Sequence, residues 1–174
     1  LAGRVAEMAN TSDAKWNANA NGVDINHNFD AGFAKVKAAE RAAGILSPGP
    51  RQYGGTYPHS EPETRAVAML CRLNTYKMVF ALHSQGEEIY YHYGRRTPTE
   101  AISLAERYAR LSGYTVCEPT GMASHGGFKD GFIERFGRPG FTIEMGKGEN
   151  PLPYHQLEPC MRAVFPIFLD AILR

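Results

Sequence analysis

The stretch Met78-Val79-Phe80-Ala81-Leu82-His83-Ser84-Gln85 places a short apolar run directly before three polar residues. A run of this length, bounded by polar residues, is typical of a buried strand. The polar residues follow the carboxyl end of that strand, where α/β proteins usually keep their sites. The stretch therefore predicts an α/β fold and makes His83 a candidate functional residue.

A second predicted strand, Phe141-Thr142-Ile143-Glu144, alternates apolar and polar residues. Burying an unpaired carboxylate is costly, so Glu144 either lines a cavity or meets a charged partner. A salt-bridged core glutamate is an equally good interpretation of this pattern alone. For His83 alone, a structural histidine is the better interpretation than a metal ligand.

Two segments have the form of capping boxes that begin helices. Ser60–Glu63 precedes a predicted helix through Leu73. Thr97–Glu100 begins a second helix, with Pro98 at its first position and Gly113 placed to close it.

The rest of the chain continues the alternation of strands and helices. A short strand is expected at 114–117 and a helix at 129–136. A final helix carries one apolar stripe, and two prolines, Pro159 and Pro166, should start or kink it. The alternation predicts an α/β sandwich. The expected stripe consists of Met161, Val164, Phe165, Phe168, Leu169 and Ile172.

Composition narrows the function classes. The 174 residues are 43% hydrophobic, enough for one globular unit with a sizeable core. The 19 basic and 18 acidic residues are well mixed, which argues against nucleic acid or an anionic membrane surface as partner. No stretch approaches the roughly 20 apolar residues of a membrane span. Three distant cysteines indicate buried thiols rather than a disulfide framework or a thiolate zinc cluster.

The segment from Trp16 to Asn28 is rich in asparagine. Asn26 and His27 follow a predicted short strand at 22–25, so they too are expected at a strand end. The earlier asparagines are better explained by turn chemistry, because asparagine side chains bond their own backbone. These are Asn17, Asn19 and Asn21.

Four segments, in this order, resemble the M14 family of zinc carboxypeptidases. Gly22–Phe29 resembles the family's GVDLNRNF segment, and Ser60–Ala66 matches its SEPETRA stretch. Leu82–Ser84 is similar to the strand end that bears the third zinc ligand, and Phe141–Glu144 to the strand that bears the catalytic glutamate. Together the four motifs are far more specific than any one of them.

The resemblance implies a mixed sheet sandwiched between helices and one zinc ion held by two histidines and a glutamate. His83 would be a zinc ligand and Glu144 the general base. The family takes its first two ligands from an HxxE motif upstream of the GVDLN segment, and no HxxE precedes Gly22. We therefore expect those ligands and the N-terminal strands to precede Leu1. Residues 1–174 would then be the C-terminal portion of a single M14 catalytic domain.

The substrate-binding residues implied by the resemblance depart from the family pattern. Asn26 and His27 match a pair that binds the terminal carboxylate of the substrate, but His27 replaces an arginine and lacks its bidentate fork. Asn17 replaces an arginine that polarises the scissile carbonyl, and it can donate only a neutral hydrogen bond. Met122 stands near the place of a substrate-capping tyrosine. Lys129 would line the specificity pocket, where it suits an acidic side chain.

Three segments, Trp16–Asn19, Asn26–His27 and His83–Glu88, look closer to the bacterial γ-D-glutamyl-L-diamino acid endopeptidases, and the last adds Gln85 to the substrate-binding candidates. That branch trims cell-wall peptides. The predicted function is zinc-dependent hydrolysis of a peptide bond near a C-terminus, with γ-D-glutamyl-diaminopimelate bonds of murein peptides as the candidate target. This favours the bacterial cell envelope or the exterior as location.

Two alternatives stay open from the sequence. The chain could be a peptide-binding or glycopeptide-binding module that keeps the fold without cleaving, or a fragment with no function of its own. If the N-terminal strands are missing, an exposed sheet edge should also invite association with another chain.

Overall fold

The computed structural model describes residues 16–118, 120 and 125–174. These residues form two compact units. The first contains the described residues of 16–76 and 120–135, and the second contains Lys77–Glu118 and Phe136–Arg174. Met122 lies outside the described residues.

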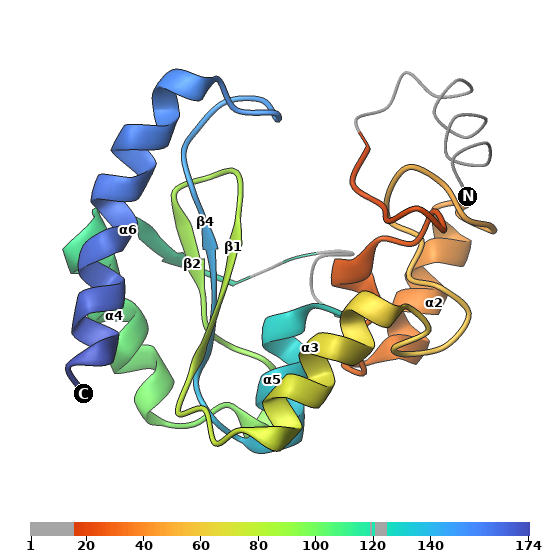
Figure 1. Ribbon diagram of the computed structural model, residues 1–174, viewed down its shortest axis with the longest axis horizontal. Helices are drawn as coiled ribbons and strands as arrows, with labels where there is room; N and C mark the ends of the chain where they lie inside the picture. Colours follow the sequence, from red (N-terminus) through yellow and green to blue (C-terminus); the bar gives the residue numbers. More distant parts are fainter. Residues whose placement is uncertain (1–15, 119, 121–124) are drawn as a thin grey trace. The chain divides into compact units, whose positions relative to one another are not determined.

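The second unit is built on a four-stranded sheet in the order β1-β4-β2-β3 (Figure 1). The strands are β1 (Val79–His83), β2 (Glu88–Tyr90), β3 (Thr115–Cys117) and β4 (Gly140–Glu144). β1 pairs with β4 and β2 with β3 in parallel, whereas β2 and β4 are antiparallel. The predicted mixed sheet is therefore confirmed, and within the described residues β1 pairs along one side only.

Helices α4 (Glu100–Ser112) and α6 (Leu157–Ile172) lie on one face of this sheet (Figure 1). They bury the side chains that alternate toward them from the strands, because successive residues of a strand face opposite sides. Arg107 of α4 and Asp170 of α6 form an ion pair that joins the two helices. The core consists of Ile89, Leu104, Ala105, Tyr108, Tyr114, Phe141, Ile143, Val164 and Ile167.

The apolar stripe expected on the final helix is only partly right. Val164 is fully buried and Phe168 packs against the core. The rest of the buried face consists of Cys160 and Ile167, which the sequence pattern did not single out. Pro159 lies in the first turn of α6, as expected for a proline that starts a helix, and Pro166 lies inside the helix. The other members of the expected stripe, Met161, Phe165, Leu169 and Ile172, are exposed.

The first unit contains a short 3-10 helix, η1 (Ile25–His27), and the helices α2 (Phe33–Ala42), α3 (Pro62–Leu73) and α5 (Phe128–Phe136). The strand expected at 22–25 is therefore wrong. The Asp24 side chain accepts a hydrogen bond from the Asn26 backbone and caps a tight turn instead, a common behaviour of aspartate.

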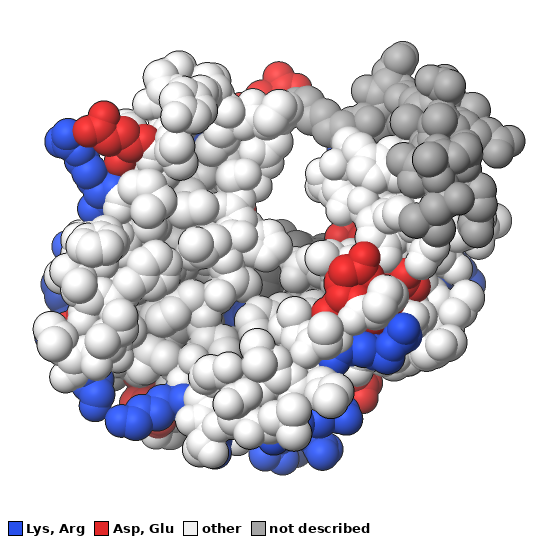
Figure 2. Space-filling view, in the orientation of Figure 1, with Lys and Arg blue, Asp and Glu red and all other residues white. Residues whose placement is uncertain are grey.

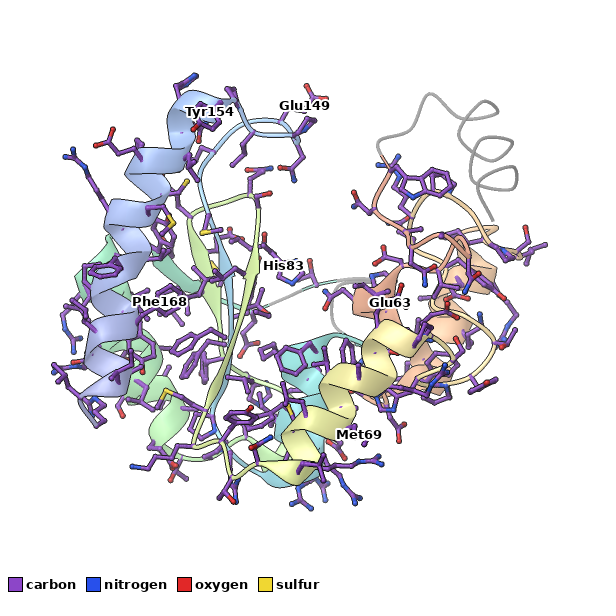
Figure 3. All side chains as sticks on the ribbon, viewed as in Figure 1. Glu63, Met69, His83, Glu149, Tyr154 and Phe168 are labelled. Atoms are coloured by element: carbon purple, nitrogen blue, oxygen red, sulfur yellow. The ribbon has the colours of Figure 1, made fainter. Side chains whose placement is uncertain are left out.

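Both capping boxes were wrong in detail, although both helices form and Gly113 closes α4 in a left-handed conformation. Neither N-cap makes a side-chain cap hydrogen bond. The Ser60 hydroxyl donates to Glu61 Oε1 at 2.8 Å, and Glu63, labelled in Figure 3, accepts from Asn19. The Thr97 hydroxyl bonds Tyr93 instead. Tertiary partners thus take the side chains that local capping would have used.

Asn28 is fully buried and organises the loop before α3. Its Nδ2 lies 2.6 Å from the Gly54 carbonyl oxygen and also reaches the Tyr57 carbonyl and the Ser60 hydroxyl. Its Oδ1 accepts from the Thr64 hydroxyl at 2.7 Å and from the Glu61 backbone. One side chain therefore satisfies buried groups on both sides of the loop.

Gly55 gives the Asn28 side chain the room it needs. Gly55 has a φ of +85°, and a Cβ there would lie 2.8 Å from Asn28 Nδ2. Helix α2 holds the same loop from its other side, through Lys37 Nζ, which donates to the Gly55 carbonyl at 2.8 Å, and through buried Glu40, which accepts from the Gly54 backbone.

Charged side chains of both signs are interspersed on the face drawn in Figure 2. No helix in the described part of the chain has the length and apolar character to cross a membrane.

Replacing Asn28 with alanine should lower the free energy of unfolding by about 2–4 kcal/mol, because several buried polar groups lose their partner at once. Urea unfolding would measure the change. Asn74→Ala is the matched control, since its exposed amide bonds only the Leu70 carbonyl, and it should cost less than about 1 kcal/mol. Equal losses in the two variants would contradict the role given to Asn28.

Candidate active site

His83 and Glu144 are the last residues of the adjacent parallel strands β1 and β4, and they are paired in the strand register. The Met145 backbone N–H donates to the His83 carbonyl at 2.9 Å, so the pairing continues past the strand ends. Because the carboxyl ends of parallel strands meet at one sheet edge, the two predicted residues come together from positions 61 apart in the chain.

Both side chains lie on the sheet face opposite the core. Phe80 and Phe141 point toward α4 and α6, where Phe80 contacts Phe168. His83 and Glu144 are an odd number of residues away from these phenylalanines, so they face the other side. Figure 3 labels His83 and Phe168, which lie on opposite sides of the sheet.

Glu144 has the electrostatics of a base that works near neutral pH. Burial, and after it the negative charge of Glu88, raise the pKa of the Glu144 carboxyl from its ordinary 4.5 to about 7. Glu88 on β2 is the direct cross-strand neighbour of Glu144. A carboxylate with such a pKa can both accept and release a proton near pH 7.

Glu88 was not predicted as a site residue, although it stands in the segment His83–Glu88 on which the resemblance rests. Its carboxylate accepts a hydrogen bond from the Tyr90 hydroxyl. The alternation of Glu88 and Tyr90 around fully buried Ile89 was the available signal, because it places both polar residues on the face away from the core.

The segment after His83 is tied to the segment after Glu144. The Ser84 hydroxyl donates to Asn150 Oδ1 at 2.9 Å, and Asn150 Nδ2 donates back to the Ser84 carbonyl at 2.7 Å. The Gly86 backbone donates to the Gly146 carbonyl at 2.8 Å. Gln85 lies between these contacts with an exposed side chain, and its substrate-binding role stays a prediction.

In the first unit, the structure brings Asn26 to the start of α5. Asn26 Oδ1 accepts from the Phe128 backbone N–H at 3.2 Å, and a Cβ on Gly127 would lie 3.4 Å from the same oxygen. The His27 ring is turned elsewhere, with Nδ1 3.3 Å from the Gln52 carbonyl oxygen. Asn26 is therefore held at the backbone of Phe128, the residue that precedes Lys129. His27 is held by the loop that contains Gln52.

Lys129 is buried, with an exposed fraction of 4%, and forms an ion pair with Asp130. Burial raises the pKa of the Asp130 carboxyl even though Lys129 acts in the opposite direction. An acidic group of a ligand would have to compete with Asp130 for the Lys129 ammonium. The predicted role of Lys129 in choosing an acidic side chain stays a prediction.

Asn17 has an exposed side chain on a loop of the first unit. Its backbone N–H donates to the Pro50 carbonyl at 2.8 Å. Asn19 Oδ1 accepts from the backbone of Asn21 and Val23, which is the turn chemistry expected there.

The described residues do not by themselves fit a zinc ion. No group of three or more His, Cys, Asp or Glu side chains that could hold a metal occurs in 16–118, 120 and 125–174. The sequence does contain one HxxE spacing, His155–Glu158, but it follows the other motifs instead of preceding them. Both side chains are exposed there, and Glu158 pairs with Arg162.

The model of the zinc carboxypeptidase family matches residues 6–166. The chain belongs to the M14 family of zinc carboxypeptidases. The γ-D-glutamyl-L-diamino acid endopeptidase 1 of Lysinibacillus sphaericus is 41% identical over 158 residues, which cover 90% of the chain and 38% of that protein. The chain thus spans about two fifths of the length of the curated relatives it matches.

Two solved M14-type structures share the fold. Bovine thrombin-activatable fibrinolysis inhibitor, in complex with a tick carboxypeptidase inhibitor, has a TM-score of 0.65 at 23% identity, covering 87% of this chain and 57% of that one. Murein-tripeptide amidase from Escherichia coli O157 has a TM-score of 0.55 at 20% identity, covering 88% and 59%. At these identities the likeness concerns the fold alone.

The raised pKa of Glu144 in this M14 chain predicts a pH-dependent effect of Glu144→Gln on stability. The folded protein binds the Glu144 proton more tightly than the unfolded chain, so this contribution is full below pH 4.5 and lost as the pH rises through about 7. Removing the charge should therefore raise the free energy of unfolding at pH 8 by about 1–2 kcal/mol, after allowance for solvent screening, and change it little at pH 4.

Urea unfolding at the two pH values would measure this difference. Glu134→Gln, an exposed glutamate of α5, is the control and should show no such pH dependence. A Glu144→Gln variant that is less stable than the wild type at pH 8 would contradict the electrostatic account.

Proposed function

We propose that this chain carries the general base and one metal ligand of a peptide-bond hydrolase, with Glu144 as the base and His83 as the ligand. The observation that carries the proposal is the register pair His83–Glu144 at the carboxyl ends of two parallel strands. Membership of the M14 family supports the reaction class, because its curated relatives include carboxypeptidases.

Glu144 would perform two proton transfers. Its carboxylate takes a proton from the attacking water and later gives it to the leaving amine. A pKa of about 7 suits both steps, since the group is neither too weak to accept the proton nor too strong a base to release it. The Glu144 backbone is fixed at the end of β4, so the carboxylate would keep the same position during both proton transfers.

We further propose one zinc ion with His83 among its ligands. Histidine is a frequent zinc ligand, and catalytic zinc sites commonly use three protein ligands. His83 can supply only one of them, and the resemblance assigns the other two to an HxxE segment that precedes the GVDLN segment in M14 enzymes.

For the substrate we propose peptides in which γ-D-glutamate is followed by a diamino acid. The relative from Lysinibacillus sphaericus, named for this bond, supports the class. His27 supports it indirectly, because a histidine held at the Gln52 carbonyl lacks the fork with which arginine grips an ordinary terminal carboxylate. The candidate substrate-binding residues stay Asn26, His27, Gln85, Met122 and Lys129.

Asn17 favours a second candidate function, a peptide-binding module without cleavage. An exposed neutral amide at the position of a catalytic arginine gives weaker stabilisation of a developing oxyanion. Such a module would bind the same peptides and release them intact.

The test compares hydrolysis of L-Ala-γ-D-Glu-meso-diaminopimelate with that of a peptide ending in an ordinary apolar residue, in the whole protein. The first should be cleaved faster, a chelator should abolish cleavage and added zinc should restore it. Glu144→Gln should lower kcat about 100-fold or more, because a positioned base contributes about that much, whereas exposed Glu134→Gln should not.

Three outcomes would count against the proposal. Equal or faster turnover of the apolar peptide would overturn the substrate class. A Glu144→Gln variant within a few-fold of the wild type would overturn the assignment of the base. Tight binding without any cleavage would favour the binding module.

A further inference from the structure

Glu88 is part of a polar row on the face of the second unit's sheet that points away from the core. His83, Glu144, Glu88 and Thr115 are successive register partners on β1, β4, β2 and β3. Partners in register project to the same face, so Glu88 lies beside the proposed base on the side away from His83. The mechanism proposed above gives Glu88 no role.

The Glu88 carboxylate is held in place by neutral groups. The Tyr90 hydroxyl donates to its Oε2, and Cys117, the register partner of Tyr90 on β3, is a second neutral neighbour. Burial, and after it Glu88, raise the pKa of both Tyr90 and Cys117, so both remain protonated and uncharged at neutral pH. The Tyr90 hydroxyl thus fixes the carboxylate, and neither neighbour cancels its charge.

The backbone at Gly86 leaves space for the Glu88 carboxylate. Gly86 has a φ of +149°, and a Cβ on it would lie 3.0 Å from Glu88 Oε2. The adjacent Glu87 is different, since it forms an ion pair with exposed Lys147 at 2.7 Å. Within the described part of the second unit, neither Glu88 nor Glu144 forms such an ion pair.

Resting on the proposed function, we propose that Glu88 is a specificity-determining residue that binds the side-chain ammonium of the diamino acid beyond the cleaved bond. A fixed carboxylate without a cation attracts an ammonium group, and a charge-assisted hydrogen bond to it is stronger than a neutral one. The position next to Glu144 puts this charge beside the reacting bond. An apolar or acidic side chain at the same place would leave the carboxylate unpaired or repelled.

Two peptides that differ only in this ammonium test the proposal, L-Ala-γ-D-Glu-L-Lys and L-Ala-γ-D-Glu-L-norleucine. The whole protein should prefer the lysine peptide in kcat/KM by about tenfold or more, because it makes one additional bond between charged groups. Glu88→Gln keeps an acceptor for the Tyr90 hydroxyl but removes the charge, so it should abolish the preference. Glu87→Gln, the matched control, should keep it.

A preference that survives in Glu88→Gln, or an equal loss on both peptides, would overturn the role of Glu88 while leaving the proposed function in place. If the wild type cleaves neither peptide, the proposed function fails. In that case, peptide binding is measured from the NMR shifts of the Glu88 and Ile89 amides. This measurement tests the role of Glu88 in binding independently of cleavage. Tighter binding of the lysine peptide that Glu88→Gln removes supports the proposal, and equal binding overturns it.

Discussion

The parallel pairing of β1 with β4 is the constraint on which the candidate site depends. It brings Phe80 against Phe141, with ring centroids 5.5 Å apart, and the same register brings His83 against Glu144 three residues later on each strand. A slip of one residue would turn a whole strand over and move its polar end to the core face. The aromatic packing around Tyr108 therefore fixes the chemistry on the opposite face.

Most elements of the second unit could be predicted from the sequence because their apolar patterns are strong, but the three-residue strand β2 was not predicted. The errors lie where tertiary contacts override a local preference. Ser60 and Thr97 have the right residue type for capping, yet each is used by another partner. On the final helix, a stripe defined by large apolar residues missed Cys160, since a small thiol can pack as well as a leucine where space is limited.

His83 and Glu144 could be predicted as strand-end residues and, through the family resemblance, as partners in one site. Their adjacency could not be derived locally, because β2 and β3 lie between β1 and β4 in the sequence and the strand order is a property of the whole sheet. The same reason hid Glu88, which matters only once β2 is placed beside β4. The pairing of Lys129 with Asp130 depends on burial, which their sequence positions alone did not reveal.

The most direct measurement of the central claim is the nuclear Overhauser effect between the His83 ring and the Glu144 side chain in the 174-residue chain. Neighbouring strands lie about 4.8 Å apart, so register partners on one face should give clear cross-peaks between these side chains. We expect contacts of Glu144 with both His83 and Glu88. Contacts of Glu144 with Leu82 and Ile89 instead would place its carboxylate on the core face and contradict the account.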